Sequence, residues 1–169
     1  MSRWFATILA VAVLALAGTA AKAAPLTVSQ TVDIKASPAA VWKIIGNFDA
    51  LAKWHPAIAS SPADHGNDIG SIRTLTLKSE GNPHFTEKLT KYSAPDFTYS
   101  YDITPTQKVI PVVGYHATIT VTKTDTGSTV TWNADFFAGS ATNDKGAIDV
   151  ITGIFRTGLD NLKTKAEKK

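Results

Sequence analysis

The sequence contains no cysteine among its 169 residues. Disulfide bonds are therefore excluded, and so are zinc and iron-sulfur sites built on thiolates. The four histidines, His55, His65, His84 and His116, are scattered without the spacing of a ligand set. No nucleophile is paired with a base in the pattern either. We expect no metal, no cofactor and no catalytic residue, and a stability that depends on a packed core.

The chain also has little excess charge of either sign. Once Arg3 and Lys22 are set aside with the N-terminal segment described next, 15 of the 17 basic residues remain, against 14 acidic residues. A nearly balanced chain without a basic patch predicts no nucleic-acid partner. Apolar residues make up 44% of the chain, which argues against a disordered protein.

Only one long hydrophobic run is present, and it lies at the N-terminus. Arg3 precedes an apolar run over 5–18, and the letters AKA at 21–23 match an Ala-x-Ala cleavage signal. The run is shorter than the roughly 20 apolar residues that span a bilayer. We predict a signal peptide over 1–23, a periplasmic or secreted protein, and no stable membrane anchor after cleavage behind Ala23. A retained anchor is the alternative.

The remaining residues, 24–169, predict one domain. Residues 26–34 alternate as a strand, and Ser37 with Pro38 opens a short helix. A second short helical segment stops before Pro56. Five segments of period-two character then follow, preceded by a short strand of weaker signal at 57–60, and the short turns between them predict antiparallel neighbours. The five segments are 69–78, 84–92, 97–103, 114–124 and 128–138.

A long helix is predicted at the end of the chain. Asn143 or Asp144 can cap it, and Gly146, Gly153 and Gly158 interrupt it, which favours either close packing on a sheet or room for a bound molecule. Its apolar stripe recurs at helical spacing and consists of Ile148, Ile151, Ile154, Phe155, Leu159 and Leu162. The element order predicts an α+β fold, in which a strongly curved antiparallel sheet of about seven strands surrounds this helix, with two short helices after the first strand.

Two charged residues break the apolar pattern of the strands. Odd positions from Ile69 to Leu77 share a face with Arg73, and Glu87 shares the apolar face of the next strand. The turn at 79–83 places Arg73 opposite or diagonal to Glu87, so we expect an ion pair. The pair either satisfies itself inside the barrel mouth or supplies polar groups to an apolar cavity, and both can hold. Arg73 should also keep the pKa of Glu87 low, which makes a poor base.

Several short segments, taken in order, resemble the START-like, Bet v 1-like (SRPBCC) superfamily and its polyketide cyclase/dehydrase group. The segments are VDIKASPAAVWKIIGNFDALAKWHPAI at 32–58, GSIRTLTL at 70–77, EKL at 87–89, YSYDI at 99–103 and TVTWNADF at 129–136. The letters WHP and RTLTL in an exported chain look most like periplasmic accessory-type proteins of methanol oxidation. The resemblance implies the helix-grip fold.

The resemblance also implies a cavity between sheet and long helix that binds hydrophobic small molecules. In the superfamily's hormone receptors a lysine on the short second strand grips a carboxylate; Ala59 matches that position here, and Arg73 is the nearest substitute. Carried over by position, the ligand-binding residues would be Arg73, Leu75, Glu87, Tyr99, Tyr101, Tyr115, Trp132, Ile154 and Gly158.

Three functions are compatible with these features. The first is a periplasmic carrier of a small hydrophobic ligand, such as an isoprenoid, a lipid or an aromatic compound. The second is an accessory protein that contacts a periplasmic protein partner in a redox system such as methanol oxidation, through Trp54, His55 and the loop 104–114. The Trp-His-Pro segment at 54–56 can instead be a packed helix end, and the loop can instead be a lid over the cavity. The third is a polyketide cyclase/dehydratase-like enzyme. We favour the carrier over an enzyme, because a carboxylate held by Arg73 is a poor proton acceptor.

Overall fold

The structure is a computed structural model and describes residues 24–105 and 108–168. The signal peptide predicted over 1–23 lies outside the described residues. Within the part of the chain that is described, no helix has the length and apolar character needed to cross a membrane.

The described residues form seven strands, three α-helices and one short 3-10 helix, which confirms the predicted α+β class. In chain order the elements are β1 (Leu26–Ile34), α1 (Pro38–Ile45), η1 (Phe48–Ala50), α2 (Leu51–Trp54), β2 (Ile58–Ser60), β3 (Ile72–Leu77), β4 (His84–Ser93), β5 (Thr98–Ile103), β6 (Val112–Thr124), β7 (Gly127–Ala138) and α3 (Asp144–Ala166).

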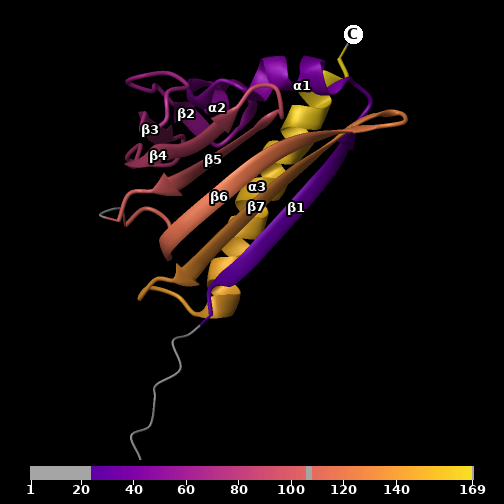
Figure 1. Cartoon of the computed structure of the whole chain (residues 1–169). Helices are drawn as coiled ribbons and strands as arrows, with labels where there is room; N and C mark the ends of the chain where they lie inside the picture. Colours follow the sequence, from indigo (N-terminus) through magenta and orange to yellow (C-terminus); the bar gives the residue numbers. More distant parts are fainter. Residues whose placement is uncertain (1–23, 106–107, 169) are drawn as a thin grey trace, which may run out of the picture.

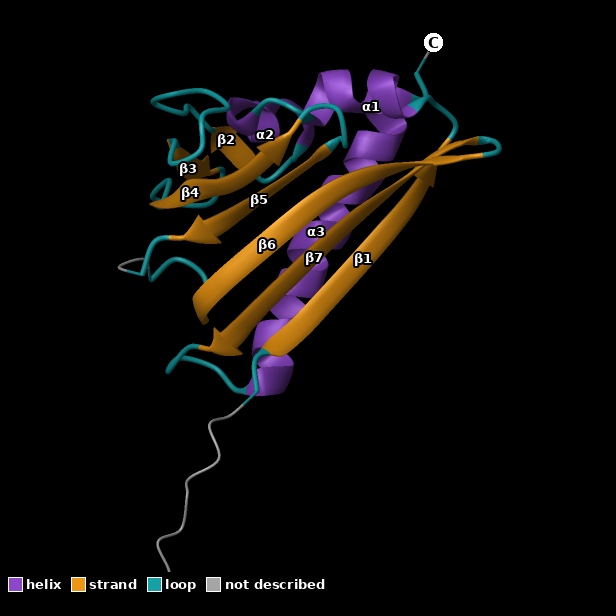
Figure 2. Cartoon of the chain, viewed as in Figure 1, coloured by secondary structure: helices purple, strands orange, loops and turns teal. Residues whose placement is uncertain are grey.

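All seven strands belong to one antiparallel sheet with the order β1-β7-β6-β5-β4-β3-β2. The sheet curves around α3, which runs along its inner face behind β6, β7 and β1 (Figure 1). Helix α1 contacts α3, and α2 contacts β2 at the far edge of the sheet (Figure 2). The predicted helix-grip arrangement is therefore confirmed, and the space between sheet and helix is where a cavity can form.

The short helices begin and end where the local sequence predicts. The Ser37 hydroxyl accepts a hydrogen bond from the Ala40 N–H at 3.3 Å, and Pro38 occupies the first helical position. The second segment divides into η1 and α2, and it ends at Trp54 with His55 in an extended conformation before Pro56. The extended residue after Trp54 leads the chain into β2, so α2 lies against β2 at one edge of the sheet.

The register of β3 and β4 confirms the predicted pairing, since Arg73 lies directly opposite Glu87. The start of the strand was predicted wrongly. Ile69 is 70% exposed and does not share the inner face, because β3 begins only at Ile72. Gly70, with a φ of +98°, turns the chain just before the strand, a conformation that favours glycine.

Helix α3 is capped by Asn143, whose side-chain oxygen accepts a hydrogen bond from the Gly146 N–H at 2.8 Å. Of the six residues in the predicted stripe, four are buried and two are half-buried. The buried four are Ile151, Phe155, Leu159 and Leu162, and the half-buried two are Ile148 and Ile154. The stripe packs on β1 and β7 and forms one side of the core.

Candidate functional site

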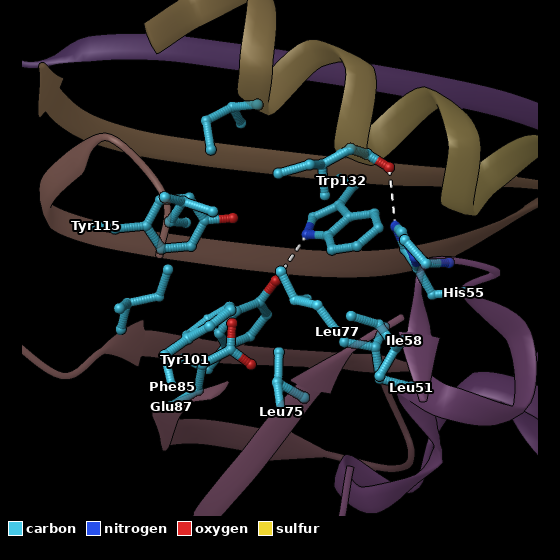
Figure 3. Close-up of a pocket in the computed structure, with 15 residues that line it drawn as sticks. Leu51, His55, Ile58, Leu75, Leu77, Phe85, Glu87, Tyr101, Tyr115 and Trp132 are labelled. Carbon is cyan, nitrogen blue, oxygen red and sulfur yellow. Dashed lines mark hydrogen bonds between the residues drawn. The ribbon is translucent and has the colours of Figure 1, made fainter. Parts of the chain in front are cut away.

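A cavity of about 120 Å³ lies between the inner face of the sheet, α2 and α3 (Figure 3). Most of its wall is apolar, with a few polar groups from the sheet and from the end of α2. The lining residues are Leu51, His55, Ala57, Ile58, Leu75, Leu77, Phe85, Glu87, Tyr101, Ile103, Ile110, Tyr115, Trp132, Ile151 and Ile154. An apolar pocket with few convergent polar groups is the usual form of a small-molecule site.

The structure brings six of the nine predicted site residues together in this wall. They are Leu75, Glu87, Tyr101, Tyr115, Trp132 and Ile154. Arg73, Tyr99 and Gly158 are buried as well but do not line the cavity, so they act on it only through the residues that they contact.

Arg73 and Glu87 form an ion pair in which both contacts fall on one carboxylate oxygen. Arg73 Nε donates to Glu87 Oε2 at 2.7 Å, and Nη2 lies 2.6 Å from the same oxygen. The side chain of Arg73 is fully buried and that of Glu87 is 5% exposed. The pair therefore differs from the usual fork, in which each carboxylate oxygen takes one N–H.

The guanidinium of Arg73 is enclosed on its other sides too. Its Nη1 donates to the Phe48 carbonyl at 2.7 Å. The rings of Phe48 and Tyr101 lie over its carbon atom, with centroids at 4.2 and 4.9 Å. Aromatic faces attract a cation, and the attraction grows when water is excluded. This cage holds the charge of Arg73 beneath the cavity wall and away from the cavity.

Burial raises the pKa of Glu87 above its usual value, although Arg73 opposes this effect. The prediction that Arg73 keeps this pKa low is therefore wrong, because the loss of hydration outweighs the attraction of the guanidinium. Burial alone would lower the pKa of Arg73, but Glu87 and the nearby tyrosines raise it, so the guanidinium stays charged.

Three buried tyrosines surround the ion pair. Tyr101 accepts a hydrogen bond from Trp132 Nε1 at 3.0 Å, so these two wall residues fix each other's rings. Burial raises the pKa of Tyr99, Tyr101 and Tyr115, and their hydroxyls remain protonated at neutral pH. The hydroxyl of Tyr99 is enclosed and has no hydrogen-bond partner of good geometry among the described residues.

His55 lines the cavity, whereas the sequence suggested either an interaction surface or a packed helix end for it. Its Nε2 lies 3.0 Å from the Ile154 carbonyl, and its Nδ1 accepts from the Ala57 N–H at 3.3 Å. Because a carbonyl only accepts and an amide N–H only donates, the ring must carry its proton on Nε2. Burial lowers the pKa of His55, which keeps the ring neutral.

Gly158 makes room for this histidine. A Cβ atom at Gly158 would lie 2.6 Å from His55 Cδ2 and 3.1 Å from Trp132 Cζ3. Of the two explanations for the glycines of α3, close packing therefore applies at this position. Gly153 differs, because no atom lies within 4 Å of a Cβ built there.

Five of the other wall residues that were not predicted fall into two groups. Leu77, Phe85 and Ile103 share the strand faces of predicted residues, so the alternation rule would have found them. Leu51 and Ile58, in contrast, reach the cavity through the fold of α2 and β2, and no sequence period shows this.

Two expectations about the surface are corrected. Trp54 and His55 are 1% and 3% exposed, so they cannot form an interaction surface. On β2, Ile58 lines the cavity and Ala59 is exposed, so Ala59 does not occupy the inward position that a ligand-gripping lysine would need. In the loop 104–114, of which 106–107 lie outside the described residues, Ile110 lines the cavity.

The residues that the structure describes contain no group of three or more histidine, cysteine or acidic side chains that could hold a metal ion. Glu87 and the neutral His55 are the titratable wall groups other than the tyrosines. The arrangement can therefore enclose an apolar molecule and offer it a few hydrogen-bonding atoms.

Comparisons with known proteins agree with this geometry. A family model described as polyketide cyclase / dehydrase and lipid transport matches residues 25–167. No curated protein matches significantly. A solved structure from Bacillus thuringiensis has a TM-score of 0.75 at 27% identity, covering 85% of this chain and 100% of its own. The protein XoxI from Bacillus cereus has a TM-score of 0.71 at 29% identity, covering 85% and 95%.

A third solved structure has a fold similar to that of this chain. The crystal structure of Ara h 8.0201 has a TM-score of 0.67 at 19% identity, covering 84% of this chain and 97% of its own, and this likeness concerns the fold alone. The Bet v 1-like arrangement of a curved sheet around a long helix is thus shared with solved structures. Since the family model covers almost every described residue, the chain belongs to the polyketide cyclase / dehydrase and lipid transport family.

Proposed function

We propose that this protein binds a small hydrophobic ligand in the cavity between sheet and α3 and carries it outside the cytoplasm, in the periplasm or as a secreted protein. The observation that carries the proposal is the apolar cavity itself, which lies inside an otherwise packed core. Protein interiors are close-packed, and large voids are few. The predicted signal peptide supplies the location.

The volume limits the ligand. An engineered cavity of about 150 Å³ lined by apolar side chains stays dry and binds benzene. The cavity here is about 120 Å³, so it accepts a molecule of about one ring or a short branched chain without rearrangement. An isoprenoid or lipid tail would enter in part, or would need the Ile110 loop to move.

The enzyme alternative is less favoured by the geometry. A general base needs a free oxygen within reach of its proton and a reacting group nearby. Oε2 of Glu87 lies within 2.7 Å of two nitrogen atoms of Arg73, and no serine or threonine among the described residues lines the cavity beside it. The remaining oxygen is better suited to hold a ligand than to exchange protons.

The accessory alternative needs an apolar docking surface. Large hydrophobic residues that are exposed among the described residues are Ile69, Val113 and Val150, at 70%, 52% and 38%. They belong to a turn, a strand and a helix, and isolated exposed apolar residues are ordinary on protein surfaces. Nothing in this distribution favours a partner protein over a ligand.

The test is native mass spectrometry of protein purified from its own periplasm, followed by organic extraction. We expect a small apolar compound to leave with the protein and to be found in the extract. Ile154→Trp should fill the cavity, so this variant should show the mass of the protein alone, without that of a bound compound. Val150→Trp is the matched control, since it adds the same ring on the exposed face of the same helix.

An empty wild-type protein that also fails to bind toluene in solution would overturn the proposal. The proposal would fail equally if Ile154→Trp carried the ligand as well as the control did, because the ligand would then lie elsewhere.

A further inference from the structure

Among the described residues, the cavity wall offers a ligand one negatively charged oxygen and no cation. Resting on the function proposed above, we infer that the ligand is uncharged, about the size of one ring, and carries a hydroxyl or N–H that donates a hydrogen bond to Oε1 of Glu87. This differs from the expectation that Arg73 would grip an acidic ligand. The difference comes from which atoms of the ion pair are already engaged.

Arg73 has no donor directed to a ligand. Nε donates to Glu87 Oε2, and Nη2 lies 2.6 Å from the same oxygen but is buried without a hydrogen bond of good geometry among the described residues. Nη1 donates to the Phe48 carbonyl, and aromatic rings cover the guanidinium. The side chain is 0% exposed and does not line the cavity. A carboxylate ligand would therefore find no charge-assisted partner at this position.

Oε1 of Glu87 is in the opposite situation. Both contacts from Arg73 fall on Oε2, and Oε1 has no hydrogen-bond partner among the described residues. The residue lines the cavity, and its carboxylate lies beside Tyr101 in the wall (Figure 3). A carboxylate oxygen that lines an apolar cavity and has no protein donor is poorly compensated there, so a donor brought by a ligand supplies the missing hydrogen bond.

Glu87 stays ionised in this arrangement. Arg73 is charged and fully buried beside it, and a protonated Glu87 would leave that charge without compensation, which is strongly destabilising. An ionised carboxylate only accepts hydrogen bonds. The group that faces the cavity is therefore an acceptor.

The other polar wall groups add no charge to the cavity. Burial raises the pKa of Tyr101 and Tyr115, so both hydroxyls stay protonated and neutral. His55 is neutral, with its Nε2 proton on the Ile154 carbonyl and its Nδ1 lone pair on the Ala57 N–H. Trp132 Nε1 donates to Tyr101.

An anionic ligand would meet the carboxylate of Glu87 without a compensating cation. A cationic ligand would lose its hydration in an apolar cavity where Arg73 already balances the charge of Glu87. Both kinds of charged ligand are therefore disfavoured.

The experiment compares four one-ring probes by NMR titration of the purified protein, with the Trp132 indole N–H signal as the reporter of the cavity. Toluene tests apolar binding alone, phenol has nearly the same shape and adds a donor, benzonitrile has only an acceptor, and benzoate is an anion. We expect phenol to bind about tenfold more tightly than toluene, as hydrogen bonds to charged groups allow. Benzonitrile, which cannot donate to Glu87, should bind more weakly than phenol, and benzoate should not bind measurably.

Glu87→Gln supplies the sharpest variant. Since Arg73 can only donate, the carboxamide oxygen must face it, and the NH₂ group then faces the cavity. The preference should invert, with benzonitrile bound more tightly than phenol. Glu80→Gln, the same change at an exposed position of the β3–β4 turn, should keep the wild-type order.

If Glu87→Gln fails to fold, the double variant Arg73→Met/Glu87→Met replaces it, because exchanging both members of a buried pair for apolar residues is tolerated far better than removing one. In that protein toluene should still bind and phenol should lose its advantage. Toluene binding as tightly as phenol in the wild type, or benzoate binding most tightly, would overturn this inference while the cavity-binding function stands. Failure of every probe would overturn both.

Discussion

A single ion pair carries most of the chemistry of the site. The alternation of strand faces was enough to predict that Arg73 and Glu87 point inward and meet, and the register confirms it. The sequence could not show that Phe48 from η1 would cap the guanidinium, nor that both nitrogen contacts would fall on one oxygen. These details depend on how the helical segment folds over the sheet, which no strand period encodes.

His55 is the residue whose titration should affect stability. Burial lowers its pKa below the ordinary 6.5, whereas the unfolded chain keeps the ordinary value. Below pH 6.5 the unfolded state therefore binds a proton that the folded state resists, and the free energy of unfolding falls as the pH falls. The stability that the neutral ring of His55 contributes is fully present above pH 6.5. It is lost as the pH falls toward the folded-state pKa, and the free energy of unfolding then changes by at most about 1.4 kcal/mol per pH unit.

Urea unfolding between about pH 5 and 8 measures this effect, since that interval brackets the ordinary histidine pKa. His55→Gln should be less stable than the wild type at the alkaline end and should show a smaller fall toward the acidic end. His84→Gln, at an exposed position of β4, should keep the wild-type slope. Equal slopes for the wild type and His55→Gln would contradict the assignment of the neutral ring.

At the scale of elements, the sequence predicted strands better than their ends. Strand β1 was predicted with its observed bounds, because its apolar positions alternate and a helix-opening Ser-Pro pair follows closely. The segment at 69–78 was extended too far, since Ile69 is apolar but follows the alternation only by chance. The sequence left open whether Trp54 and His55 form a packed helix end or an interaction surface, because α2 is one turn long, too short for a helical period to reveal its inner face.

The glycines of α3 give a matched test of helix packing. Gly158→Ala should improve the intrinsic helix propensity by about 1 kcal/mol. The new methyl group would nevertheless lie 2.6 Å from a His55 ring that two hydrogen bonds hold in place. Overpacking of this kind costs about 1–3 kcal/mol, so we expect a net loss of stability.

Gly153→Ala is the internal control on the same helix. No atom lies within 4 Å of its new methyl group, so the propensity gain should appear undiminished, as a rise of up to about 1 kcal/mol in the free energy of unfolding. Chemical denaturation of both variants measures the difference. A stabilised Gly158→Ala would show that the ring moves freely and that the glycine does not serve packing.

At the scale of the whole molecule, the family fold leaves a space that this sequence fills only in part. The helix-grip order was predictable from the succession of elements, and six predicted residues do lie in the wall. The volume of the cavity was not predictable, since it is the difference between the space under the curved sheet and the sum of the side chains that enter it. With no cysteine to cross-link the chain, that core must also supply the stability.

The predicted signal-peptide cleavage site is compatible with the observed sheet. The first paired residue of the sheet is Leu26, opposite Phe136, so cleavage after Ala23 would leave β1 intact. We therefore expect the protein isolated from the periplasm to begin at Ala24, as measured by intact mass and N-terminal sequencing. Ala23→Arg should block processing, because the cleavage site requires a small residue, whereas Thr27→Ser, on the exposed side of β1, should not. An unprocessed wild-type chain held in the membrane fraction would replace the free carrier with an anchored one, and the cavity would then collect its ligand at the membrane surface.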